Sequence, residues 1–260
     1  MDCRKHSFNN LIFSFDREPC LDSTFNDLSI EKFHHYLSHH EINTSIDKNY
    51  QNIKIQLSEL GFYDLKFDCA TYAGILTLSE KNPHFWLPGA YIHIVQYEGD
   101  NVATLPIFEK KIQGDLSSIL KKIDVFFGTA FLKMNESVVQ ETLTDKKIVH
   151  HYPIMALQEL LINSIIHREY QSTMPIRFNV FSNHIEIINS GGLFGEVKKN
   201  FNKLTSYRNP LIANVIRDFG YCNNYGSGIN IVKKELAKNK NPDIEFDYSD
   251  DYFSAIIKKS

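Results

Sequence analysis

Three polar side chains recur at intervals of four in the apolar stretch YPIMALQELLINSIIHREY, residues 152–170. They are Glu159, Asn163 and His167, and at about 100° of rotation per residue a helix places them within roughly 80° of one another. A carboxylate can accept a proton from water, and an amide oxygen is a hard ligand that suits Mg²⁺. The spacing therefore predicts a helix face that activates water and holds a metal, with an ordinary amphipathic surface helix as the alternative.

The helix that positions these residues has a recognisable start. Pro153 suits a first turn because its φ is already helical, and Tyr152 before it is biased toward extended geometry. The polar triplet therefore begins about two turns into the helix.

Two strands are predicted immediately downstream, at residues 175–181 and 184–188, joined as a tight hairpin. The second strand runs into Asn189, Ser190 and the pair Gly191 and Gly192. Paired glycines at a strand end permit positive φ and let a ligand approach the backbone. An ordinary glycine-rich turn is the alternative.

A third motif, Gly226, Ser227 and Gly228, opens a further helix whose apolar residues repeat at i, i+3 and i+7. Free backbone N–H groups and the positive end of the helix dipole meet at such a start, which makes it an anion site. Phosphate is the usual occupant, although a lone GxG before a helix is common.

In this order the motifs resemble the divergent ATP-binding domain at the C-terminus of transcriptional regulators and RecG-like helicases, which is related to the GHKL fold. The matching stretches are ALQELLINSIIHREY, PIRFNVFSNHIEIINSGGL, SYRNPLIANVIRDFGY and YGSGINIV, over roughly residues 150–258. The resemblance implies a two-layer α/β sandwich that binds ATP and Mg²⁺.

The resemblance also implies individual roles. Glu159 would be the general base for water, and Asn163 would bind the Mg²⁺ that bridges the triphosphate. His167 and Arg168 match the start of the family's HRDY element, in which Glu169 here replaces Asp. Backbone or hydroxyl groups would approach the nucleotide at Gly191, Gly192, Gly226, Ser227 and Gly228.

Asn189 stands where GHKL proteins usually carry an Asp that reads the amino group of adenine. Its amide oxygen can still accept a hydrogen bond, but its NH₂ group must find another partner. Residues 206–209 fall where a lid would lie, and Arg208 there is either a phosphate contact or an ordinary surface residue.

The first half of the chain predicts a mixed α/β module. Helices are expected from about Ile30, over residues 52–60 and from Gly114 to Lys133, with a strand in AYIHIVQY. Residues 71–83 fit a buried helix or a strand equally well. We place the module at residues 1–140 and the GHKL-like domain at 141–260, with residues 134–151 as a linker or a short strand pair, so the fold class is α+β.

This half resembles the region that precedes the ATP-binding domain in the same family. Full-length relatives begin with a Schlafen AlbA-like nucleic-acid-binding domain, which we do not find here. The chain therefore resembles an N-terminally shortened version, an excised piece of a longer protein, or one half of a split system. A net charge of -3 offers no broad basic surface. We expect a partner protein to supply any contact with nucleic acid, and a homodimer is compatible with the family.

The remaining features bound the compartment and the function class. The four cysteines form no CxxC motif, and neither a signal peptide nor a run of about 18 apolar residues is present, so we expect a cytoplasmic protein without a membrane segment.

Two functions stay open: an ATP-binding regulator, with or without ATP hydrolysis, and a degenerate interaction scaffold. Glu159 and Asn163 favour the first, whereas Asn189 and the lack of a long glycine-rich lid favour the second.

Overall fold

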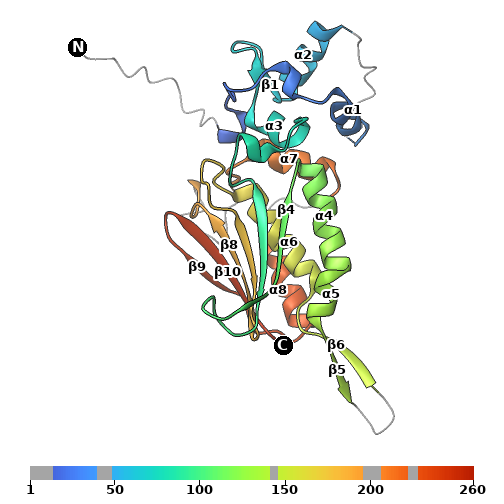
Figure 1. Ribbon diagram of the computed structural model, residues 1–260, viewed down its shortest axis with the longest axis vertical. Coiled ribbons are helices and arrows are strands. Elements are labelled where there is room, and N and C mark those ends of the chain that lie inside the picture. The colour runs from blue at the N-terminus through green and yellow to red at the C-terminus, as the bar shows by residue number, and fades with distance from the viewer. Residues whose placement is uncertain (1–13, 40–48, 141–145, 196–205, 222–227) are drawn as a thin grey trace, which may run out of the picture.

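A six-stranded mixed sheet forms the centre of the protein. The computed structural model describes residues 14–39, 49–140, 146–195, 206–221 and 228–260 (Figure 1). The strand order is β4-β3-β7-β8-β10-β9; β3 and β7 run parallel, and the other neighbours are antiparallel. The strands are β3 (Tyr91–Tyr97), β4 (Pro106–Gln113), β7 (Ile176–Val180), β8 (His184–Ser190), β9 (Glu245–Tyr248) and β10 (Tyr252–Lys258).

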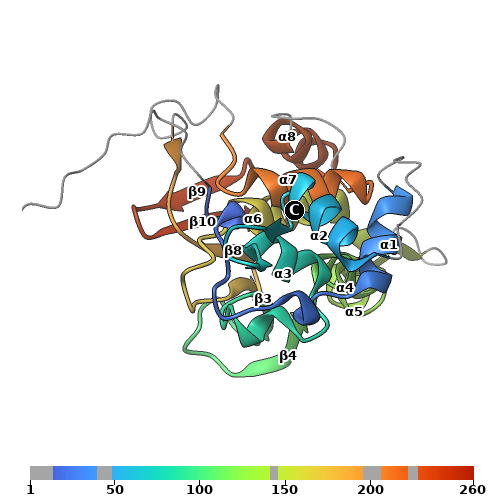
Figure 2. The ribbon, with the colours of Figure 1, turned by 90° about the horizontal axis from the view of Figure 1, so that it is seen from above.

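Helices cover one face of this sheet and leave the other open (Figures 1 and 2). They are α4 (Leu116–Gly128), α5 (Ala130–Asn135), α6 (Ile154–His167) and α8 (Gly228–Lys238). Along β8, Ile185 and Ile187 are buried while His184 and Glu186 are partly exposed, as expected for a strand with one packed face. The α+β class and the two-layer arrangement are therefore as predicted.

A smaller N-terminal lobe, the described residues between 14 and 89, stacks on one end of the sandwich above α7 (Pro210–Asp218) (Figure 1). Its elements are η1 (Phe15–Arg17), η2 (Phe25–Asp27), α1 (Ile30–His39), α2 (Tyr50–Glu59), β1 (Tyr63–Asp64), β2 (Cys69–Ala70), α3 (Tyr72–Leu78) and η3 (Pro83–Phe85). A hairpin of β5 (Glu136–Gln140) and β6 (Lys146–His150) projects from the opposite end.

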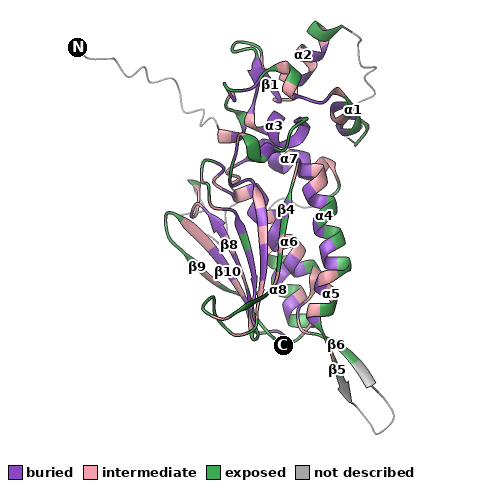
Figure 3. Cartoon of the chain, in the orientation of Figure 1, coloured by how far each residue is buried: buried purple, intermediate pink, exposed green. Residues whose placement is uncertain are grey.

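Residues 71–83 fit either a helix or a strand by sequence. In the structure, most of this segment is helix α3, which begins after Thr71. Its start is capped, since the Thr71 hydroxyl accepts a hydrogen bond from the Gly74 amide at 3.1 Å. The helix is buried on all sides (Figure 3), which removes the polar stripe that would identify it from sequence. Gly74 is needed because a Cβ there would lie 2.1 Å from the Phe62 carbonyl oxygen.

Some elements differ from the sequence expectations. The helix expected from Gly114 to Lys133 is two helices, because Thr129 takes non-helical angles of φ -131° and ψ -82°. Strands β4, β9 and β10 were not predicted. Since β3 and β4 precede residue 140 and β7 to β10 follow it, one sheet takes strands from both sides of that boundary. Of the two alternatives for this region, the strand pair forms, from residues 136–140 and 146–150.

The described helices include none with the length and apolar content needed to cross a membrane.

Candidate functional site

Helix α6 carries the polar triplet on its least buried face. The helix follows Pro153, and Leu157, Leu161 and Ile165 on its far side are at most 2% exposed. Glu159, Asn163 and His167 are each partly exposed. The predicted division of α6 into a packing face and a polar face therefore exists.

Glu159 and Asn163 contact each other and the start of α8. The Asn163 amide nitrogen donates to Glu159 Oε1 at 3.2 Å. A Cβ placed on Gly228 would lie 2.3 Å from that carboxylate oxygen and 2.9 Å from the Asn163 nitrogen, so any larger residue at position 228 would displace the ends of these two side chains. Because the nitrogen faces the carboxylate, the Asn163 oxygen is the atom left for a cation.

The environment of Glu159 suits a proton acceptor. Burial raises the pKa of its carboxyl group, and the hydrogen bond from Asn163 partly opposes that shift. A carboxylate with a raised pKa is a stronger base at neutral pH. The pair therefore combines a base with a hard oxygen ligand at the N-terminus of a helix.

Asn189 lies beside α6 near the end of β8 and is 4% exposed. Its amide nitrogen donates to the Ser164 carbonyl at 2.9 Å, which fixes the orientation of the amide. Its oxygen is buried and has no hydrogen-bond partner among the residues that the structure describes. An unpaired buried acceptor is costly by about 1–3 kcal/mol, so this oxygen is suited to a ligand that donates a hydrogen bond.

The backbone amides of the glycine pair after β8 are hydrogen bonded within the protein. The amides of Gly191 and Gly192 donate to the carbonyls of Asp251 and Asp250, at 2.7 and 3.0 Å. A Cβ on Gly192 would lie 1.8 Å from the Ser249 carbonyl oxygen. The two amides thus join the turn after β8 to the residues directly before β10, and the predicted approach of these glycines to a nucleotide stays a prediction.

His167 and Arg168 end α6 in contrasting environments. The His167 ring stacks on Tyr207 with centroids 5.7 Å apart, and burial together with the Arg208 charge lowers its pKa to about 4. Arg168 is 1% exposed and donates to the Ser172 carbonyl at 2.9 Å, with Nε and Nη1 unpartnered. Arg168 is thus buried against the turn after α6 rather than on the polar face.

Residues 206–209, predicted to lie near a lid, are docked on the end of α6. Arg208 forms an ion pair with Glu169 and donates to the Gly192 carbonyl at 3.0 Å. Asn209 is fully buried, and its amide donates to the carbonyls of Ile166 and Arg168 at 2.8 Å each. Arg208 is therefore not an ordinary surface residue.

Asn209 was not found from the sequence. Its position directly before Pro210 indicates a helix start but not that the side chain caps another helix. Two of the predicted site residues, Gly226 and Ser227, lie outside the described residues.

A family model described as "Putative ATP-dependent DNA helicase recG C-terminal" matches residues 173–257, which is less than half of the chain. The match includes Asn189 and the four predicted glycines Gly191, Gly192, Gly226 and Gly228, but not α6. No curated protein matches the chain.

Among solved structures, the chain is similar to the DIP2311 protein from Corynebacterium diphtheriae, with a TM-score of 0.63 and 16% identity. The similarity covers 92% of this chain and 46% of that protein. The chain therefore shares a fold with that protein over almost its whole length while spanning less than half of the other chain. Its C-terminal part is similar to an ATPase-like domain of the RecG C-terminal type.

Proposed function

We propose that this chain is an ATP-binding regulatory protein whose nucleotide lies between α6, the end of β8 and the start of α8. The observation that carries the proposal is the contact of Gly228 with Glu159 and Asn163. It brings a helix N-terminus, which favours phosphate, against a base and an oxygen ligand. The match of residues 173–257 to an ATPase-like family supports the same function.

In this proposal the Asn163 oxygen holds Mg²⁺, which when bound neutralises charge on the phosphates. Glu159 accepts a proton from the attacking water, and the desolvation that raises its pKa favours that role. Any hydrolysis therefore depends on the two residues in different ways. Asn163 is needed to bind the metal complex, and Glu159 only to turn it over.

The base would be read by Asn189. Its unpartnered oxygen accepts a hydrogen bond from the exocyclic amino group of adenine. Guanine presents a carbonyl oxygen at that ring position, so two acceptors would face each other. We therefore propose ATP rather than GTP as the ligand.

The test is a thermal-shift screen with ATP, ADP and GTP, each with and without Mg²⁺, because a ligand that binds the native state alone raises its stability. We expect a shift with Mg²⁺-ATP that GTP does not give. Asn163→Ala should abolish Mg²⁺-dependent binding measured by calorimetry while the circular dichroism spectrum stays intact. Glu159→Ala should keep binding and lose turnover.

A flat response to every nucleotide would contradict the proposal. The chain would then act as an interaction scaffold through a partner protein. Unchanged Mg²⁺-ATP affinity in Asn163→Ala would refute the metal role alone.

A further inference from the structure

Helix α7 belongs to the C-terminal half of the chain, but the N-terminal lobe holds its first turn. Asp16 is fully buried, and its Oδ2 accepts hydrogen bonds from the amides of Leu211 and Ile212 at 2.7 and 3.1 Å. Its other oxygen accepts from the Ser14 hydroxyl at 2.5 Å. A carboxylate at a helix N-terminus satisfies free amides and complements the helix dipole. Asp16 thus caps a helix 195 residues away in the chain.

The lobe also contacts the other end of α7. The Tyr36 hydroxyl, on α1, donates to Asp218 at 2.6 Å, and Tyr36 is 2% exposed. Close packing adds to the contact at the first turn, since a Cβ on Gly61 would lie 2.8 Å from Leu211. The position of α7 is therefore set at both ends by residues of the lobe.

The residues directly before α7 hold the helix of the candidate site. Asn209 binds the last carbonyls of α6, and Arg208 binds Glu169 and the Gly192 carbonyl. Leu211 and Ile212 thus donate to the carboxylate of Asp16 in the lobe, while Asn209 caps the end of α6. Glu159 and Asn163 lie on that same α6, within its 14 residues.

We propose that the N-terminal lobe sets the geometry of the nucleotide site through α7, with Asp16 and Tyr36 as positioning residues. The inference rests on the proposed function for its ligand but not for its mechanical part. Because coupling between two sites is reciprocal, ATP bound at α6 would in turn stabilise the contacts of the lobe with α7. The strength of the contacts between the lobe and α7 would then depend on whether the site holds a nucleotide.

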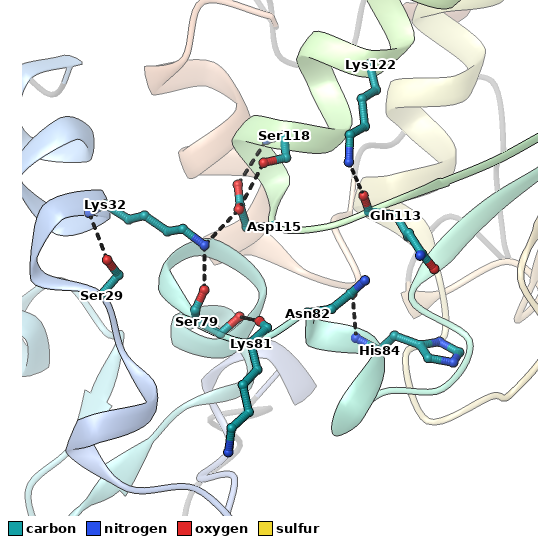
Figure 4. Close-up of polar contacts among 10 residues, drawn as sticks. All are labelled: Ser29, Lys32, Ser79, Lys81, Asn82, His84, Gln113, Asp115, Ser118 and Lys122. Atoms are coloured by element: carbon teal, nitrogen blue, oxygen red, sulfur yellow. Dashed lines mark hydrogen bonds and ion pairs between the residues drawn. The ribbon is translucent and has the colours of Figure 1, made fainter.

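The variants separate the effect of the contacts between the lobe and α7 from the effect of the lobe's other contacts. Asp16→Ala removes the cap, whereas Asp16→Asn keeps an oxygen for the two amides, and Tyr36→Phe removes only one hydroxyl. Lys32→Met is the control. As Figure 4 shows, Lys32 joins the lobe to Asp115 at the start of α4, at 3.0 Å, through contacts that do not include α7.

Amide hydrogen exchange of the free proteins tests the mechanical link. We expect Asp16→Ala to accelerate exchange at least about tenfold in peptides covering both 209–218 and 160–169, because local opening of α7 frees the end of α6. Tyr36→Phe should accelerate exchange in the same two peptides to a smaller extent. It is the variant to use if Asp16→Ala does not fold. Lys32→Met should leave residues 160–169 at the wild-type rate. An acceleration confined to 209–218 would overturn the inference.

Calorimetry with Mg²⁺-ATP tests the consequence for the ligand. Asp16→Ala should weaken binding by about fivefold or more, the lower end of ordinary coupling between sites, and Asp16→Asn should restore it. Equal losses in Asp16→Ala and Lys32→Met would assign the effect to general destabilisation and refute the positioning role. If wild-type protein binds no nucleotide, the proposed function fails, and the exchange comparison still decides the link.

Discussion

His167 offers a quantitative test of the packing at the end of α6. Burial against Tyr207 and the nearby Arg208 charge lower its pKa from 6.5 to about 4 in the folded protein. In the unfolded chain the imidazole returns to its ordinary pKa. The unfolded state therefore binds more protons between pH 6.5 and pH 4, and acidification favours unfolding in that window.

The size of the effect follows from the same shift. A difference of 2.5 between the pKa values 6.5 and 4 corresponds to about 3 kcal/mol of unfolding free energy once the pH is well below both. Between pH 7.5 and pH 5 most unfolded chains bind a proton at His167 and few folded ones do. This difference lowers the unfolding free energy by about 2 kcal/mol.

The assay compares wild-type protein with His167→Gln, which cannot titrate, by urea unfolding at pH 7.5, 6 and 5. The difference in unfolding free energy between the two proteins should change by about 2 kcal/mol over that range, with the wild type losing stability relative to the variant. Other titrating groups cancel in the difference. Parallel pH profiles for the two proteins would show that His167 is not desolvated in this way and would refute the packing against Tyr207 and Arg208.

Four further substitutions test three glycines and the proposed base-reading role of Asn189. Gly192→Ala should lower the unfolding free energy by about 3 kcal/mol, since a Cβ would collide with a backbone carbonyl, whereas Gly128→Ala, with no atom within 4 Å, should raise it slightly in the same denaturation assay. Gly228→Ala displaces only the flexible ends of the Glu159 and Asn163 side chains, so the melting temperature should stay near wild type while Mg²⁺-ATP affinity in calorimetry falls. Unchanged affinity would contradict the proposed site. Asn189→Leu should keep the fold and abolish any preference for ATP over GTP in the thermal-shift screen, and a preserved preference would rule out its role.

The sequence was most informative where a local pattern decides the structure. Residues 152–170 show a helical period and a clear start, and α6 with its polar face forms there as expected. The hairpin of β7 and β8 follows from alternation and a short turn, and the Phe181 amide closes it on the His184 carbonyl at 2.9 Å. In both cases the interactions that fix the element lie within a few residues of one another.

The sequence was least informative where the deciding partner is remote. The sequence predicts Gly191 and Gly192 as ligand-binding glycines. No residue near them in the chain indicates that their amides donate to the carbonyls of residues 251 and 250. Asp16 lies 195 residues before Leu211 in the chain, and no local pattern indicates that it caps α7. Strands β4 and β10 were missed for a related reason, since strand stability depends on neighbours in the sheet more than on intrinsic preference.

The position of Asn189 shows how a remote contact changes the meaning of a substitution. An Asn in place of the Asp that the resemblance to GHKL proteins predicts weakens the expectation of adenine binding, because the NH₂ group needs a partner of its own. That partner is the Ser164 carbonyl, 2.9 Å away. An Asp at this position in the same orientation would place two acceptors against each other and lose that bond. Asn189 and α6 are therefore matched, because the Asn189 nitrogen joins the strand to the helix. The Asn189 oxygen has no partner among the described residues and keeps the acceptor that the proposed contact with adenine requires.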